Sequence, residues 1–124
     1  MNVAGLRVLI VEDEAIIAMT AEDMLEELGC APTGIAATLP EALEAARDGG
    51  FDLALLDINL NGQDSVPVAD LLRQKRIPFV FTTGYGSSGR GTEHEDVPLV
   101  AKPYRLTELG AAIERALRRE TGGG

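Results

Sequence analysis

Acidic, hydroxyl and ammonium side chains stand directly after apolar segments at four separate places in the sequence. They are Glu12 and Asp13, Asp57, Thr83, and Lys102. The carboxylates suit a hard divalent cation, and Mg²⁺ fits best because it binds through one or two carboxylates and keeps several waters. The hydroxyl and the ammonium can each bind one oxygen of a phosphoryl group, while the Asp57 carboxylate is available as a nucleophile. The set predicts phosphoryl transfer, provided that the fold brings it together.

Each of these groups follows a segment that is typical of a β-strand. Residues 53–56 are continuously apolar and bounded by turn signals, which favours a strand buried on both faces. The strands that we expect cover residues 6–11, 31–37, 51–57, 77–81 and 97–101. Pro32 and Pro98 favour edge positions for the second and the last of them. Because the carboxyl ends of parallel strands share one edge of a sheet, the polar groups can converge there.

The segments between the strands show helical spacing. Apolar side chains recur on one face of residues 14–28, at Ile17, Ala21, Met24 and Leu28. Thr38 and Glu41 form the pattern of a capping box that opens a second helix, and the last helix begins near residue 106. Residues 86–96 contain no large apolar side chain. A helix there would have nothing to bury, so we expect a loop or a short, poorly anchored helix.

The alternation of strands and helices predicts an α/β fold with five parallel strands and helices on both faces of the sheet. The length of 124 residues suits one domain, which we assign to residues 1–120, followed by a flexible tail at residues 121–124. The net charge of −9 argues against DNA binding, because no basic stripe exists to displace counterions. The lone Cys30 and the lack of a signal peptide or membrane-spanning stretch favour a cytoplasmic protein.

Five motifs that agree in order and spacing over nearly the whole chain resemble the response-regulator receiver domain of two-component signalling. The matching residues are Glu12, Asp13, Asp57, Thr83 and the pair Lys102-Pro103. The resemblance implies a flavodoxin-like, doubly wound (βα)5 fold with strand order 2-1-3-4-5. It implies that Asp57 accepts a phosphoryl group from a kinase histidine, and that Glu12, Asp13 and Asp57 bind Mg²⁺ with the backbone carbonyl of Asn59.

The same resemblance implies how the module works and what it contacts. The phosphoryl donor would be a sensor histidine kinase or a phosphotransfer protein, and the output would be a change of conformation that regulates a downstream protein. A phosphorylation-dependent dimer is compatible with this role, whereas DNA or membrane contact by this chain is not expected. The module would catalyse only its own phosphorylation and dephosphorylation.

Two positions depart from the usual receiver pattern. Receivers usually carry Tyr or Phe three residues before the lysine as a rotating switch, and this chain has Leu99 there. The stretch from Phe81 to Gly86 is similar to a subgroup of single-domain receivers with a Phe-Ala-Thr-Gly-Xxx-Tyr signature, although Gly86 replaces the final tyrosine. We expect Thr83 to move toward the phosphoryl group, residues 84–96 to become ordered, and Tyr85 to be the aromatic residue that responds.

Other interpretations make different demands on the residues. A phosphohydrolase with an aspartyl-phosphate intermediate typically needs a second acid two residues after the nucleophile, and Asn59 stands there. A flavodoxin-like binding protein would need a loop that cradles phosphate after the first strand, where Glu12, Asp13 and Glu14 would repel phosphate without a metal. A receiver that works by binding alone would not need the complete set of acids, threonine and lysine. The phosphorylated switch is the prediction that uses all of them.

Overall fold

A five-stranded parallel sheet forms the centre of the molecule, in a computed structural model that describes residues 3–84 and 96–122. The strand order across the sheet is β2-β1-β3-β6-β7. Its strands are β1 (Arg7–Val11), β2 (Ala31–Ala36), β3 (Leu53–Asp57), β6 (Phe79–Thr83) and β7 (Leu99–Ala101). Counted along the chain within this sheet, the order is 2-1-3-4-5, so the predicted fold class and strand order are confirmed.

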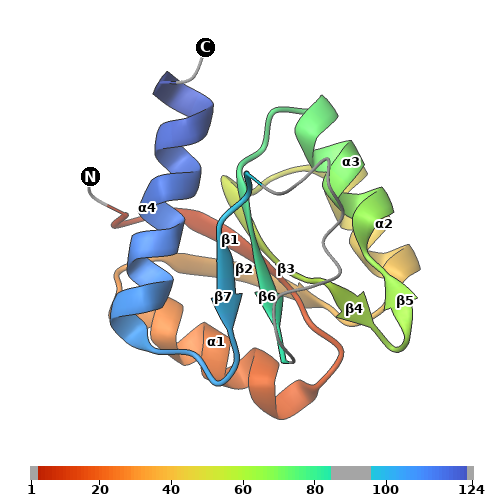
Figure 1. Ribbon diagram of the computed structural model, residues 1–124, viewed down its shortest axis with the longest axis horizontal. Coiled ribbons are helices and arrows are strands. Elements are labelled where there is room, and N and C mark those ends of the chain that lie inside the picture. The colour runs from red at the N-terminus through yellow and green to blue at the C-terminus, as the bar shows by residue number, and fades with distance from the viewer. Residues whose placement is uncertain (1–2, 85–95, 123–124) are drawn as a thin grey trace.

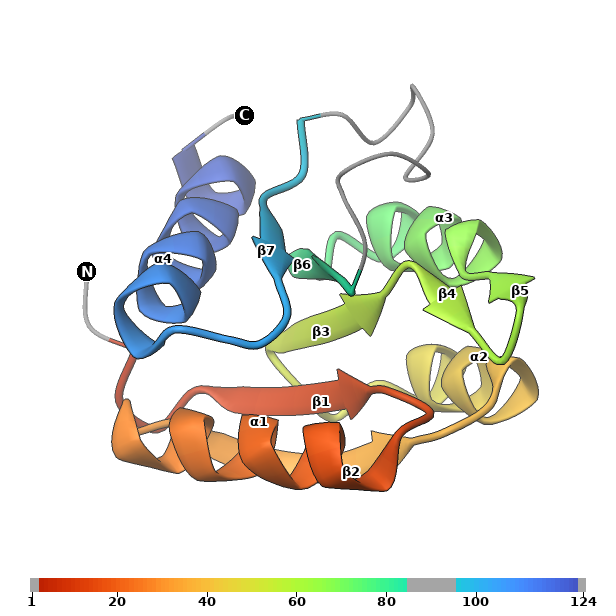
Figure 2. The ribbon, with the colours of Figure 1, turned by 60° about the horizontal axis from the view of Figure 1, so that its bottom comes forward.

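Helices cover both faces of the sheet (Figures 1 and 2). Helices α1 (Ala15–Glu27) and α4 (Leu106–Gly122) pack on one face, and α2 (Leu39–Asp48) and α3 (Val66–Gln74) pack on the other. Each face has its own hydrophobic core, and the alternation of side chains along the strands divides the apolar residues between the two. Central strands β3 and β6 are buried at every position, which explains their continuous apolar runs.

Helix α1 uses a slightly different face from the one that its spacing predicts. The fully buried side chains are Ala18, Ala21 and Leu25, whereas Ile17 and Met24 are half-buried at the margins. Ala18 and Ala21 carry short side chains, so the helix backbone can approach the sheet closely. The longer apolar side chains then cover the flanks of the contact instead of its centre.

Helix α2 begins with the capping box that the sequence predicts. The Thr38 side chain accepts a hydrogen bond from the Glu41 amide at 3.2 Å, and the Glu41 carboxylate accepts one from the Ala37 amide at 2.9 Å. The capping pattern is therefore confirmed, with the glutamate reaching one residue before the cap. These bonds satisfy amides that the first turn of a helix leaves without partners.

A short antiparallel hairpin between β3 and α3 was not predicted. Strands β4 (Asn59–Leu60) and β5 (Gln63–Asp64) pair through a turn at Asn61 and Gly62, where φ is 53° and 81°. Positive φ at both central residues is the geometry of a type I′ turn, and Asn-Gly is the dipeptide that favours it. The turn signal was visible in the sequence, but the flanking strands are only two residues long.

The two C-terminal strands begin later than their apolar runs. Strand β6 starts at Phe79 and continues through Thr83, and Thr82 and Thr83 pair with Val100 and Ala101 of β7. The two threonines that were expected to follow the strand therefore belong to it. Pairing with β7 extends β6 toward the carboxyl edge, because ladder hydrogen bonds require a neighbouring strand and not an apolar side chain.

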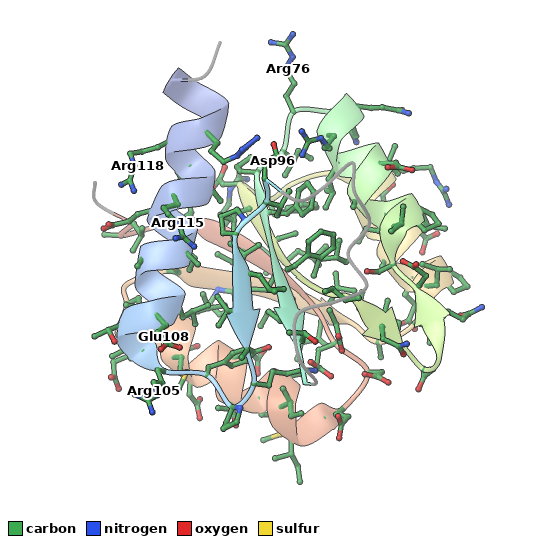
Figure 3. The ribbon with its side chains drawn as sticks, viewed as in Figure 1. Arg76, Asp96, Arg105, Glu108, Arg115 and Arg118 are labelled. Atoms are coloured by element: carbon green, nitrogen blue, oxygen red, sulfur yellow. The ribbon has the colours of Figure 1, made fainter. Side chains whose placement is uncertain are left out.

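Asp96 anchors the entry to β7 at the amino end of the strand (Figure 3). Its carboxylate pairs with Arg73 from α3 at 3.2 Å and also with Arg119 from α4.

Helix α4 continues to Gly122, so residues 121 and 122 are helical although we expected a tail from residue 121. Residues 85–95, including Tyr85 and most of the segment expected to become ordered, lie outside the described residues. In the described part of the chain, no helix is long and apolar enough to cross a membrane.

Candidate functional site

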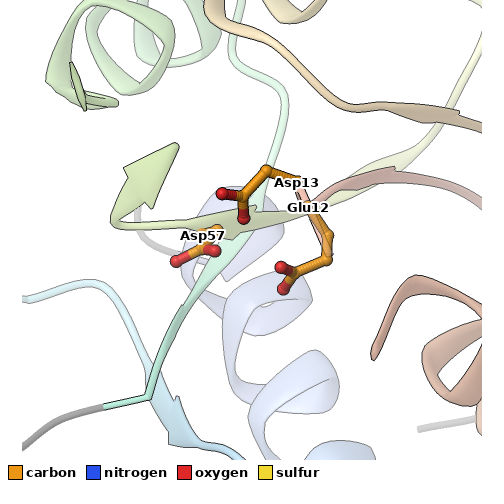
Figure 4. Close-up of side chains that lie close together, drawn as sticks. All are labelled: Glu12, Asp13 and Asp57. Carbon is orange, nitrogen blue, oxygen red and sulfur yellow. The ribbon is translucent and has the colours of Figure 1, made fainter. Parts of the chain in front are cut away.

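Three carboxylates converge at the carboxyl edge of the sheet (Figure 4). Glu12 and Asp13 follow β1, Asp57 ends the neighbouring strand β3, and one carboxylate oxygen of each lies within 4.8 Å of the others. Parallel pairing of Val11 with Leu56 places these strand ends side by side. The structure thus brings together the three acids that the sequence predicts at one site.

Lys102 reaches into the same cluster from the end of β7. Its Nζ lies 2.9 Å from Glu12 Oε1 and 3.1 Å from Asp57 Oδ2. The side chains of Glu12, Asp57 and Lys102 are only 1%, 6% and 9% exposed. An ammonium group that is almost enclosed with two carboxylates holds each of them in position and offsets part of their charge.

Burial dominates the electrostatics of this cluster. It raises the pKa of Glu12 to about 7, against the lowering effect of the hydrogen bonds from Lys102 and from the Glu14 amide. Burial likewise raises the pKa of Asp57, while Lys102 opposes the rise. The pKa of Lys102 is raised because Glu12 and Asp57 together outweigh the cost of burying its charge. The site therefore carries more negative charge than its single ammonium partner neutralises.

Backbone amides of the hairpin fix the other carboxylate oxygens. The Asn59 amide donates to Asp57 Oδ1 at 3.2 Å, and the Asn61 amide donates to Asp13 Oδ2 at 3.0 Å. The Asn59 side chain turns into the hairpin, where its Oδ1 accepts from the Gly62 amide at 2.8 Å. The short hairpin thus orients two acids of the cluster from one side.

A pocket of about 820 Å³ opens beside Asp57. Its polar lining includes Asp13, Asp57, Asn59, Thr83 and Lys102. Thr83 is buried at the end of β6, so the predicted hydroxyl lies at the same pocket as the predicted nucleophile and ammonium. The pocket is large enough to admit a phosphoryl group together with part of a donor molecule.

The structure describes one of the two residues that the sequence analysis connected with switching, Leu99 at the usual switch position, but not the other, Tyr85. Leu99 is half-buried and packs against the core beneath α2 and α3, opposite Phe81 in the sheet. It faces away from the core that contains α1 and α4, so it takes no part in the carboxylate cluster. Tyr85 lies outside the described residues, and its role stays a prediction.

Sequence reasoning missed Thr82 and Tyr104. Thr82 is 1% exposed and lies opposite Asp57 in the sheet, and Tyr104 is buried and lines the pocket. The signal that could have revealed the first of them is the threonine at position 82, where the Phe-Ala-Thr-Gly signature has alanine.

Comparisons with known proteins agree with this geometry. The model of the response regulator receiver domain family matches residues 8–114. The chain is 35% identical over 117 residues to the transcriptional regulatory protein PdtaR of Mycobacterium tuberculosis, which covers 91% of this chain and 57% of PdtaR. It is 37% identical over 116 residues to the phyllosphere-induced regulator PhyR of Methylorubrum extorquens, covering 89% of this chain and 43% of PhyR. The chain thus spans about half the length of these curated relatives.

Two solved structures of SdrG match over almost their full length. The solution structure of SdrG from Sphingomonas melonis Fr1 superposes with a TM-score of 0.83 at 41% identity, covering 94% of this chain and 99% of SdrG. The BeF3-activated conformation of SdrG superposes with a TM-score of 0.78 at the same 41% identity, over 92% and 98% of the two chains. The chain therefore belongs to the response regulator receiver domain family, whose members are phosphoacceptor switches of two-component signalling.

Proposed function

We propose that Asp57 is the residue that accepts the phosphoryl group, from a histidine of a sensor kinase or phosphotransfer protein. The observation that carries this proposal is the setting of its carboxylate, at the end of β3 with Lys102 Nζ at 3.1 Å and with Glu12 and Asp13 in the same cluster. Asp57 combines a position on the pocket wall with a neighbouring cation and two neighbouring acids. The chain then acts as a cytoplasmic switch that regulates a downstream protein.

The donor set at this site fits Mg²⁺. Three carboxylates and one ammonium leave an excess of negative charge, and carboxylate and carbonyl oxygens are the ligands that Mg²⁺ takes. Asp13, Asp57 and the Asn59 backbone carbonyl would hold the ion directly, with Glu12 completing the acidic set. When bound, Mg²⁺ supplies charge neutralisation to the carboxylates and to one phosphoryl oxygen.

The transfer step follows from these positions. An Asp57 carboxylate oxygen forms a bond to phosphorus as the bond between phosphorus and the donor imidazole nitrogen breaks, and the electron pair of that bond stays on the imidazole. Lys102 and Thr83 each bind one oxygen of the transferred group. Because Lys102 Nζ already contacts Asp57, a small movement suffices to follow the new charge. Attack of water on the phosphorus later restores the free carboxylate, so both steps concern only the chain's own aspartate.

A phosphohydrolase acting on other substrates is less well supported. Such a mechanism requires a proton donor two residues after the nucleophile, and Asn59 cannot act as an acid. Its side-chain oxygen is also engaged by the Gly62 amide within the hairpin. Nothing at this position can protonate a leaving group, so the aspartyl phosphate is suited to persist as a signal.

The proposal is tested by incubation with a small phosphodonor and Mg²⁺, followed by intact-mass measurement. We expect one phosphoryl group on the wild-type chain and none on Asp57→Asn, which keeps the shape of the side chain but removes the nucleophilic carboxylate. Asp64→Asn is the matched control, because Asp64 is an exposed acid that lines the same pocket. Equal labelling of Asp57→Asn and wild type would refute the assignment.

A further inference from the structure

The β4–β5 hairpin ends in a tip of two residues, Asn61 and Gly62, which lie outside the pairing of its strands. Both tip amides are bonded to side chains. The Asn61 amide donates to Asp13 Oδ2 at 3.0 Å, and the Gly62 amide donates to Asn59 Oδ1 at 2.8 Å. The tip is exposed, so water would have been a sufficient acceptor for both amides. Bonds to side chains instead hold the tip in one conformation.

The rest of the hairpin is fixed to the body of the protein. At its base, the amide and the hydroxyl of Ser65 both donate to the Ile58 carbonyl at 3.0 Å, and Ser65 is fully buried. In the middle, the Leu60 side chain is fully buried in the core beneath α2 and α3. At the tip, Asn61 Nδ2 contacts the Ala37 carbonyl at 3.5 Å. The hairpin is therefore a rigid frame along its whole length.

This frame determines how two acids of the cluster can face a cation. Asp57 Oδ1 accepts the Asn59 amide at 3.2 Å, and Asp13 Oδ2 accepts the Asn61 amide at 3.0 Å. Each carboxylate thus has one oxygen turned toward the hairpin. An ion that takes both oxygens of either carboxylate would have to turn that group away from its amide. The hairpin therefore favours coordination through one oxygen of each acid.

The two common hard divalent cations place different demands on such a site. Ca²⁺ takes about six to eight oxygen ligands in a flexible arrangement, and a carboxylate often gives it both oxygens. Mg²⁺ is smaller, requires a nearly ideal octahedron and keeps several of its waters. A site whose acids each offer one fixed oxygen suits Mg²⁺, whereas acids that are free to rotate would suit Ca²⁺ as well. Selectivity between the two ions then depends on the rigidity of the hairpin.

We propose that Asn59 is a positioning residue that determines the cation specificity of the site. By accepting the Gly62 amide, its side chain holds the hairpin tip closed. The closed tip keeps Asp13 in the orientation that favours Mg²⁺ over Ca²⁺. This inference deepens the proposed function and rests on it. Asparagine suits the role better than aspartate, because it supplies an accepting oxygen without adding a fourth negative charge beside the three carboxylates.

Calorimetric titration of the unphosphorylated protein with MgCl₂ and with CaCl₂ tests the inference. Asn59→Ala removes the accepting oxygen and keeps the backbone carbonyl. We expect its dissociation constant for Mg²⁺ to rise by about threefold to tenfold, the usual effect of one hydrogen bond, and that for Ca²⁺ to change by less than about twofold. Asn59→Asp keeps the acceptor and adds a charge that attracts both ions, so the ratio of its two dissociation constants should stay at the wild-type value. A ratio as low as that of Asn59→Ala would overturn the role of the acceptor.

Two glycine variants separate the effect of the tip from a general loss of stability. Gly62 and Gly50 have positive φ of 81° and 89°, and among the described residues a Cβ at either position would meet open space. Valine is strained at positive φ, so Gly62→Val should open the tip, and Gly50→Val should strain the turn before β3 to a similar degree. We expect both variants to lower the melting temperature and only Gly62→Val to lose selectivity for Mg²⁺. An equal loss in Gly50→Val would show an effect of stability and refute the inference.

Measuring metal binding and phosphorylation on the same samples separates this inference from the proposed function. We expect the Mg²⁺ concentration for half-maximal phosphorylation of Asn59→Ala to rise by the same factor as its dissociation constant. If the wild-type chain binds Mg²⁺ and gains one phosphoryl group by mass, but Asn59→Ala weakens Mg²⁺ and Ca²⁺ equally or weakens neither, the specificity role alone is wrong. If the wild-type chain neither binds Mg²⁺ nor gains a phosphoryl group, the proposed function fails, and this inference fails with it.

Discussion

At the residue scale, the site concentrates charge where water is largely excluded. Glu12 and Asp57 lie almost fully buried on either side of Lys102, and Asp13 adds a third carboxylate at the rim. Opposite charges in such a setting hold one another firmly, but the cost of burying an excess carboxylate remains. The excess negative charge of the metal-free site is therefore unfavourable. A change in this charge should alter the stability of the protein, its affinity for the metal and the rate of phosphoryl transfer.

Stability of the metal-free protein should fall as pH rises toward neutrality. Burial raises the pKa of Glu12 from 4.5 to about 7, so the folded state binds this proton more tightly than the unfolded chain does. The resulting stabilisation is complete below pH 4.5 and is lost as pH rises through 7. This loss of the free energy of unfolding amounts to at most about 3 kcal/mol, and we expect Glu12→Gln to reduce it. Urea unfolding between pH 5 and 8 measures it, with the exposed Glu26→Gln as control. Identical pH dependence of Glu12→Gln and wild type would contradict the account.

Removing the ammonium should strengthen metal binding. Lys102→Met keeps most of the apolar stem but deletes the positive charge that lies 3.1 Å from Asp57. The remaining acids then attract Mg²⁺ without competition, so we expect a severalfold lower dissociation constant in calorimetric titration. Phosphorylation should be slower in the same variant, because one phosphoryl oxygen loses its cationic partner. Weaker Mg²⁺ binding would show instead that Lys102 mainly organises the carboxylates.

At the scale of the elements, strand ends and helix starts carry the function. Strands β1, β3 and β7 each present one member of the Glu12, Asp57 and Lys102 set, and the β4–β5 hairpin orients Asp57 and Asp13 through backbone amides. Strand β6 adds Thr83 at the pocket and Thr82 beneath it. Helices contribute mainly by covering the sheet, so their caps affect stability more than chemistry.

The cap of α2 can be used to test whether helix caps contribute mainly to stability. Thr38→Ala removes the side-chain oxygen that accepts the Glu41 amide, and we expect a loss of about 1 kcal/mol in the free energy of unfolding. Thr20→Ala is a matched substitution inside α1, where the threonine hydroxyl donates to the Ile16 carbonyl. Alanine is the better helix former at such a position, so Thr20→Ala should leave stability unchanged or raise it slightly. Chemical denaturation of both variants checks the contrast, and equal losses would argue against the cap.

At the scale of the whole molecule, three acids meet at the carboxyl edge of the sheet with Lys102 among them. Arg115 and Arg118 project from α4, and Arg76 projects beyond the end of α3 (Figure 3). Lys102 can neutralise only one of the three carboxylates, in a chain with a net charge of −9. A divalent cation bound at the cluster would stabilise the entire fold, because the unfolded chain does not hold the three acids together.

Mg²⁺ should therefore raise the melting temperature. We expect the free energy of unfolding to increase by about 2.7 kcal/mol when the free ion is at a hundredfold excess over its dissociation constant. Asp13→Asn should lose most of this gain, since it keeps an acceptor for the Asn61 amide but lacks the charge. Thermal unfolding with NaCl at equal ionic strength separates site binding from general screening. An increase of the same size in Asp13→Asn would count against the acidic site.

The sequence by itself determined the sheet, its central strands and the residues of the carboxylate cluster. Buried parallel strands require continuous apolar runs, and polar residues that directly follow such runs must meet at one edge, so the order of residues alone places Asp57 and Lys102 there. The tertiary structure decided what depends on partners distant in the chain. Pairing with β7 extended β6 through Thr83, and close packing of two alanines set the buried face of α1. No local pattern encodes these contacts, because each side chain is satisfied by a residue that only the folded chain brings near.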